Sequence, residues 1–87
     1  SGAKYIGQFK NSRQHGEGTY ISKIGEKFIG FWTDDQLNGK GIFTSPNGER
    51  YEGEFKNSRK HGKGIMTYPD GKKYSGEWEN GKIKSGV

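Results

Sequence analysis

The sequence contains no cysteine, and only 26% of its 87 residues are hydrophobic. Without cysteine the chain forms neither disulfide bonds nor thiolate metal sites, which fits a reducing compartment. No run of about 18 apolar residues occurs, so we expect no membrane-spanning helix. No signal-peptide pattern opens the chain either. These absences lead us to expect an intracellular, cytoplasmic protein.

The chain is also too short to enclose a large catalytic core, because a small domain buries a modest share of its surface. Its two histidines, His15 and His61, have no further metal ligands clustered around them in sequence. We interpret both as structural residues of tight connections, since an imidazole bonds local backbone groups there. We therefore expect a protein without enzymatic activity and without cofactor or metal.

Glycines and aromatic residues, in contrast, are abundant and recur every 23 positions. Three sets of positions share this spacing: Tyr5, Phe28, Tyr51 and Tyr74; Phe9, Trp32, Phe55 and Trp78; Gly7, Gly30, Gly53 and Gly76. A period between about 20 and 50 residues is typical of repeat proteins, in which one small unit stacks on copies of itself. The low mean hydropathy of −1.14 therefore does not indicate disorder.

One unit, residues 51–73, predicts a β-hairpin and a short return. Residues 51–55 alternate an aromatic ring or glycine with a charge, as a strand with one dry face does. Residues 57–62 are polar and predict a longer connection, whereas Asp70-Gly71 and Asn47-Gly48 suit a three-residue loop closed by a left-handed glycine. Lys23-Ile24-Gly25 holds the same place. The predicted fold is all-β: an elongated, twisted antiparallel meander with strands near 4–9, 17–22, 27–32, 40–44, 50–55, 63–68 and 73–78.

The spacing of glycines and rings also predicts a register in which each large ring covers a glycine of the next strand. Within hairpins the predicted opposite pairs are Phe55 and Gly64, Gly53 and Met66, Tyr51 and Tyr68, Phe9 and Gly18, and Trp32 and Gly41. Between hairpins they are Trp78 and Gly62, Trp32 and Gly16, and Phe55 and Gly39.

This register gives the sheet two different faces. One face is predicted to form a partner-binding groove lined by Tyr5, Phe9, Tyr20, Phe28, Trp32, Phe43, Tyr51, Phe55, Met66, Tyr68, Tyr74 and Trp78. The other is predicted to be solvated, with Lys63 opposite Glu77, and carries Glu52, Glu54, Ile65, Thr67 and Ser75. An elongated apolar strip on a protein surface usually marks an interaction site.

The net charge of +5 is distributed unevenly. A basic rim is predicted at one end of the hairpins, from Lys10, Arg13, Lys56, Arg59, Lys60 and Lys63. The plain interpretation is a solvated loop edge; the functional one is contact with an anionic phospholipid surface. Nucleic acid is a weaker alternative, because acidic residues are interleaved and the rings already have a structural role.

The pattern Tyr-x-Gly-x-Phe/Trp followed by His-Gly-x-Gly resembles the MORN (membrane occupation and recognition nexus) repeat. Residues that match it well are Tyr51, Gly53, Phe55, His61, Gly62 and Gly64, and Tyr5, Gly7, Phe9, His15, Gly16 and Gly18. The middle unit departs from it, with Phe28 for Tyr, Phe31 where an acid is usual and Asn38 for His. The resemblance implies a non-catalytic module that binds proteins through a groove, associates with itself or binds phospholipid.

We expect residues 1–4 to be a lead-in left by expression, followed by repeats at 5–27, 28–50 and 51–73 and a partial repeat at 74–87. The expected function is a protein interaction and assembly scaffold that binds a protein or peptide through the aromatic groove and the sheet edges, at a membrane or cytoskeletal surface. The alternative is binding of acidic phospholipid, such as a phosphoinositide, that recruits a host protein to a membrane.

Overall fold

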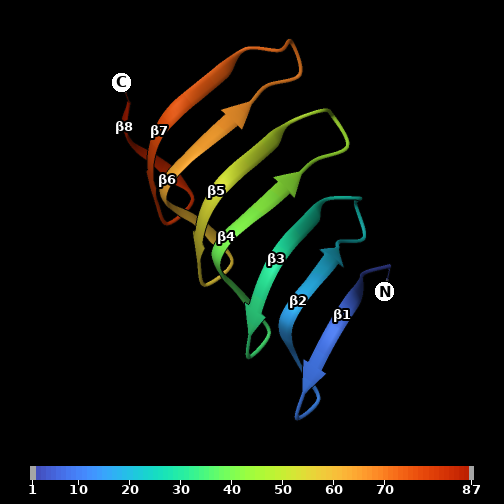
Figure 1. The fold of residues 1–87 in the computed structure, drawn as a ribbon. Helices are drawn as coiled ribbons and strands as arrows, with labels where there is room; N and C mark the ends of the chain where they lie inside the picture. The colour runs from blue at the N-terminus through green and yellow to red at the C-terminus, as the bar shows by residue number, and fades with distance from the viewer. Residues whose placement is uncertain (1, 87) are drawn as a thin grey trace.

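The computed structural model describes residues 2–86, which form a single antiparallel sheet with its strands in sequence order (Figure 1). The sheet confirms the predicted all-β meander, and the molecule is elongated, with extents of 41 × 23 × 17 Å. Its eight strands are Lys4–Lys10 (β1), Arg13–Ile21 (β2), Lys27–Thr33 (β3), Gln36–Thr44 (β4), Arg50–Lys56 (β5), Arg59–Thr67 (β6), Lys73–Glu79 (β7) and Lys82–Gly86 (β8). No helix within residues 2–86 is long and apolar enough to cross a membrane.

The loops that follow β2, β4 and β6 have the predicted geometry. Gly25, Gly48 and Gly71 adopt left-handed φ angles of 92°, 103° and 90°. The N–H of each glycine donates to the carbonyl three residues earlier, over 2.8 to 3.1 Å. Glycine carries no Cβ, so the strand after each loop starts without strain.

The turns at the opposite end are shorter than predicted. The turn between β5 and β6 consists of only two residues, Asn57 and Ser58, with φ angles of 52° and 65°. Asn11-Ser12 and Asp34-Asp35 form two-residue turns of the same kind. Two consecutive left-handed residues give the tight turn that matches strand twist, and Asn and Asp tolerate this conformation better than most side chains. Strands β2, β4 and β6 therefore begin four residues before their predicted starts. Strand β8, which follows the same kind of turn at Asn80-Gly81, was not predicted.

The predicted register is correct between hairpins and wrong within them. Gly62 lies opposite Trp78, Gly16 opposite Trp32 and Gly39 opposite Phe55, as predicted. Within the third hairpin, however, Tyr51 lies opposite Met66, Gly53 opposite Gly64 and Phe55 opposite Lys60. The same displacement separates Phe9 from Gly18 and Trp32 from Gly41. Because the predicted pairs are displaced by an even number of residues, every side chain still lies on its predicted face.

The two-residue turn displaces the pairs next to it by four residues, and a bulge in each even-numbered strand of the first three hairpins reduces the displacement to two. In β6 three residues, from His61 to Lys63, lie opposite the single residue Glu54 of β5. Gly62 adopts a left-handed φ of 74°, and Gly16 and Gly39 take φ angles of 78° and 86° at the equivalent positions. His15 and His61 therefore lie inside strands at these bulges, and not in the connections where we predicted them.

As a result, glycines meet glycines across the whole sheet. The row consists of Gly7, Gly18, Gly30, Gly41, Gly53, Gly64, Gly76 and Gly86. The Tyr51 ring lies against this row, and its hydroxyl donates to the carbonyl of Glu54 at 2.9 Å. Tyr5 makes the same bond to the carbonyl of Gln8 at 3.0 Å. In the first and third hairpins the glycines are therefore covered by a tyrosine of the same hairpin, whereas in the second Leu37 lies next to Gly30 and the ring of Phe55 next to Gly41.

The aromatic face is the core of the protein. Its buried residues are Trp32, Leu37, Phe43, Tyr51, Phe55, Met66 and Trp78. Tyr51 packs edge-on against Trp78 with 5.0 Å between ring centroids and 76° between ring planes, and Tyr5 packs in the same way on Trp32. Such pairs stabilise by about 0.5–1.5 kcal/mol beyond the burial of their area. Neighbouring repeats therefore share one core in place of a second covering sheet.

The tight turns also join each repeat to the one before it. The N–H groups of Asp35, Ser58 and Gly81 donate to the carbonyls of Gln14, Leu37 and Lys60, over 2.9 to 3.1 Å. The side chains of Asp35 and Ser58 complete the link by accepting the N–H groups of Gln14 and Leu37, at 2.7 and 3.0 Å. Each turn therefore fixes the spacing of two repeats.

Replacing Ser58 with alanine should weaken this link measurably. The N–H of Leu37, a residue that is fully buried, would lose its acceptor, which costs about 1–3 kcal/mol. Ser58→Gly loses the same acceptor but relieves the left-handed conformation of Ser58, so it should cost less. Urea unfolding of both variants measures the difference; an alanine variant as stable as the wild type would show that the link contributes nothing.

Candidate binding surface

Most of the aromatic residues predicted to line a partner-binding groove instead pack on one another. Of the predicted set, Trp32, Phe43, Tyr51, Phe55, Met66 and Trp78 are buried, and Tyr5, Tyr20, Phe28, Tyr68 and Tyr74 pack against them half-buried. Phe9 alone is largely exposed, at 60%. A hollow of about 290 Å³ remains at Tyr20, Phe28 and Trp32. Another hollow, of about 260 Å³, lies on this face beside Phe28, Phe43 and Phe55, so part of the space over the rings stays open.

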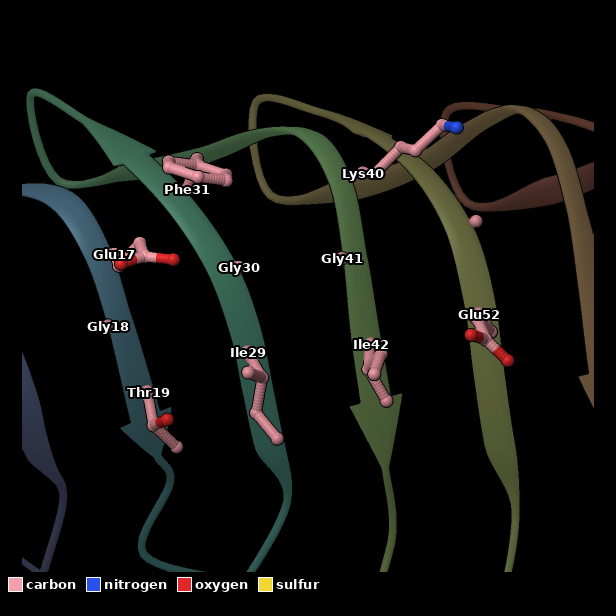
Figure 2. A pocket seen from close by; sticks show the side chains of 11 residues that line it. Glu17, Gly18, Thr19, Ile29, Gly30, Phe31, Lys40, Gly41, Ile42 and Glu52 are labelled. Atoms are coloured by element: carbon pink, nitrogen blue, oxygen red, sulfur yellow. The ribbon is translucent and has the colours of Figure 1, made fainter.

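A larger hollow, of about 640 Å³, lies on the opposite face of strands β2–β5 (Figure 2). Its floor is the glycine row, with Gly18, Gly30, Gly41 and Gly53. A second hollow of about 410 Å³ shares Glu52 and Gly53 with it and extends over β6 and β7. We call the two together the glycine groove.

Two rows of side chains flank this floor, as Figure 2 shows for β2 to β4. The isoleucine row consists of Ile6, Thr19, Ile29, Ile42, Glu52, Ile65 and Ser75, which lie opposite one another from strand to strand. The charged row consists of Glu17, Phe31, Lys40, Glu54, Lys63 and Glu77. Lys63 lies opposite Glu77, as predicted.

This face is therefore less polar than the predicted solvated surface. Ile29 is 38% exposed, Phe31 56% and Ile65 44%. A signal for it was present in the sequence, because isoleucines occupy strand positions that alternate with the rings. Polar neighbours masked that signal, since the isoleucines come together only when the strands pair.

The equivalent side chains of Gln8 and Glu54 also close the bulges. The Oε1 atom of Gln8 accepts the N–H of Glu17 at 3.1 Å, and Oε1 of Glu54 accepts the N–H of Lys63 at 3.1 Å. These side chains supply backbone N–H groups with the acceptor that the distorted ladder does not provide. Residues 8 and 54 thus have a structural role.

The predicted basic rim is divided in the structure. Lys56 and Arg59 lie opposite each other and, with His61, line a polar hollow of about 520 Å³. Lys10 and Arg13 form the equivalent pair in the first hairpin, where Arg13 forms an ion pair with Asp34 at 3.8 Å. Lys63 belongs to the charged row. Of the six predicted rim residues, Lys56 and Arg59 are thus the two that line this polar hollow.

The side chain of Lys60 lies on the aromatic face, in a hollow that Arg59 also lines. Its ammonium group lies over the rings of Phe43 and Tyr51, at 5.0 and 5.7 Å from their centroids. Burial lowers the pKa of Lys60, and this effect outweighs the opposing attraction of Glu49 and Glu26. Lys60 therefore differs from the other predicted rim residues in packing on aromatic rings, and its contact with lipid stays a prediction.

A single open sheet of hairpins that share one aromatic core, which is what residues 2–86 form, defines a β-repeat protein. The repeat unit that produces it is a known one. The family model of the MORN repeat matches residues 5–27, 28–50, 51–73 and 74–84, so the chain belongs to the MORN repeat family. A search of curated proteins finds no match for the chain.

Proposed function

We propose that this MORN module is a non-catalytic scaffold that binds a segment of another protein in the glycine groove. The observation that carries the proposal is the exposed apolar surface of Ile29, Phe31 and Ile65 beside a floor without side chains. Contiguous apolar surface that a small protein leaves uncovered commonly serves as an interaction site. The charged row along the other side of the floor supplies ionic specificity.

The test is selection of binding peptides from a displayed random library on the wild-type protein. Each selected peptide is then measured against Ile42→Glu, which places a charge in the groove, and against the double variant Lys56→Glu and Arg59→Glu. We expect the groove variant to weaken binding about tenfold or more and the double variant to bind normally. If the peptides bound both variants as tightly as the wild type, the peptide-binding site would lie outside the glycine groove.

The second candidate function is recognition of acidic phospholipid, supported by the hollow that contains Lys56, Arg59 and His61. Its test uses phosphatidylcholine vesicles with and without a phosphoinositide. Sedimentation with the acidic vesicles alone, lost in the Lys56→Glu and Arg59→Glu variant, would favour it. Self-association through the edge strands stays a separate prediction, which light scattering across a concentration series measures.

A further inference from the structure

Phe31 departs from a structural rule that other repeats of the same chain follow. Positions 8, 31, 54 and 77 are equivalent in the period, and Gln8 and Glu54 each accept a backbone N–H from the neighbouring bulge. Phe31 has no acceptor atom to offer Lys40, the residue in the corresponding place. The repeat thus gives up a hydrogen bond at this position.

The bulge next to Phe31 is correspondingly open. A Cβ atom placed on Gly16 or Gly62 would collide with the Oε1 atom of Gln8 or Glu54, whereas one placed on Gly39 would meet nothing within 4 Å. The ring of Phe31 therefore does not cover the bulge, and 56% of the residue is exposed. A residue that breaks a local rule without a gain in packing marks a functional position.

Phe31 belongs to the apolar part of the glycine groove. It extends from the same strand as Ile29, with Gly30 between them, and Ile42 lies opposite Ile29 on β4 (Figure 2). A large rigid ring beside aliphatic side chains is the arrangement that dominates the energy of many interfaces. Phe31 is therefore placed to anchor a bound segment.

The floor restricts the conformation of that segment. Strands β2–β7 each pair with a neighbour on both sides, so an extended segment crossing them would find few backbone partners for its own N–H and C=O groups. An α-helix satisfies these groups internally. A helix of about 20 residues is about 30 Å long, which fits along a molecule whose longest extent is 41 Å.

The charged side chains beside the floor indicate which charges the bound segment would carry. Glu17 and Glu52 lie at the hollow together with Lys40. A helix with one apolar stripe, an acidic side chain near Lys40 and basic side chains near Glu17 and Glu52 complements this surface. We infer that Phe31 anchors an amphipathic α-helix of a partner protein, laid across strands β2–β5; this inference rests on the proposed function.

The experiment compares Phe31→Gln with Ile24→Gln on peptides of about 20 residues, each about 30 Å long as a helix, selected on the wild-type protein. Phe31→Gln restores the side chain found at position 8, so its urea midpoint should equal or exceed that of the wild type. Its affinity for the selected peptides should fall about tenfold or more. Ile24 is 64% exposed in the loop after β2, and its variant should bind normally.

The selected peptides should carry apolar residues at the i, i+3, i+4 and i+7 spacing of a helix and gain helical circular dichroism on binding. Peptides with alternating or proline-rich patterns would overturn the helical partner. Normal binding by Phe31→Gln together with loss in Ile42→Glu would overturn the anchor but leave the groove as the site. Normal binding by both variants, or no enrichment of peptides, would overturn the groove itself.

Discussion

Gly53→Ala should lose about 3 kcal/mol or more of unfolding free energy, the upper range for an overpacked position. A Cβ atom at this position would lie 2.5 Å from Cα of Gly64 and 2.6 Å from the carbonyl oxygen of Lys63. Both contacts are with backbone atoms of the adjacent strand β6, so no side-chain rotation relieves them. The strands would have to separate, which breaks their ladder. Urea unfolding followed by tryptophan fluorescence measures the loss.

Gly39→Ala is the matched control for this substitution. Nothing lies within 4 Å of a Cβ atom at Gly39, but its φ of 86° is left-handed. The control therefore carries the conformational penalty of about 1–2 kcal/mol without a collision. If the two variants were equally stable, the close approach of the glycine row would not be the reason for glycine at position 53.

The folded protein should also lose stability steeply above pH 10 because of Tyr51. Burial, the largest cause, raises the pKa of Tyr51 to about 12 from 10.0, and the nearby Glu54 carboxylate adds to it; the hydrogen bond to the Glu54 backbone opposes the shift. The unfolded chain releases this proton near pH 10 and the folded chain near pH 12. Stability from Tyr51 is therefore complete below pH 10 and lost between pH 10 and 12, by up to about 2–3 kcal/mol.

Tyr51→Phe isolates this contribution, because lysines titrate in the same pH range in both proteins. At neutral pH the variant should be less stable by about 1 kcal/mol, since it lacks the hydrogen bond to the carbonyl of Glu54. Above pH 10 the difference should shrink and then reverse, because phenylalanine has no proton to lose. Parallel stability curves from pH 7 to 12 would contradict the assignment to Tyr51.

The two faces of the sheet differ in what they contribute to stability. The aromatic face holds the repeats together through shared rings and the tight turns, so a substitution there is expected to reduce stability. The glycine groove adds little to the core and exposes Phe31 at a position where Gln or Glu would bond a bulge. Comparing urea midpoints with peptide affinities for variants of both faces separates folding effects from binding effects.

Several features of the fold could be predicted because they depend on local chemistry. The 23-residue period, the three loops closed by Gly25, Gly48 and Gly71, and the separation of rings from charges all follow from residue spacing. The register within hairpins could not be predicted. It depends on Asn57 and Ser58 both adopting left-handed conformations and on Gly62 forming a bulge, and a polar segment such as 57–62 does not reveal which of its residues turn.

The sequence by itself thus determined the repeat, the family and the face on which the side chains of the predicted strands lie, because strand alternation and turn residues act over a few neighbouring positions. Only the tertiary structure decided how far the side chains of each face cover it. Tyr51 and Phe55 lie on β5 and Trp78 lies on β7, and the ring of Trp78 packs on that of Tyr51 when the strands pair. The same pairing places Ile29 opposite Ile42 and leaves the glycine floor exposed between them and Phe31. Such contacts between strands depend on register and curvature, and the sequence of a single segment specifies neither.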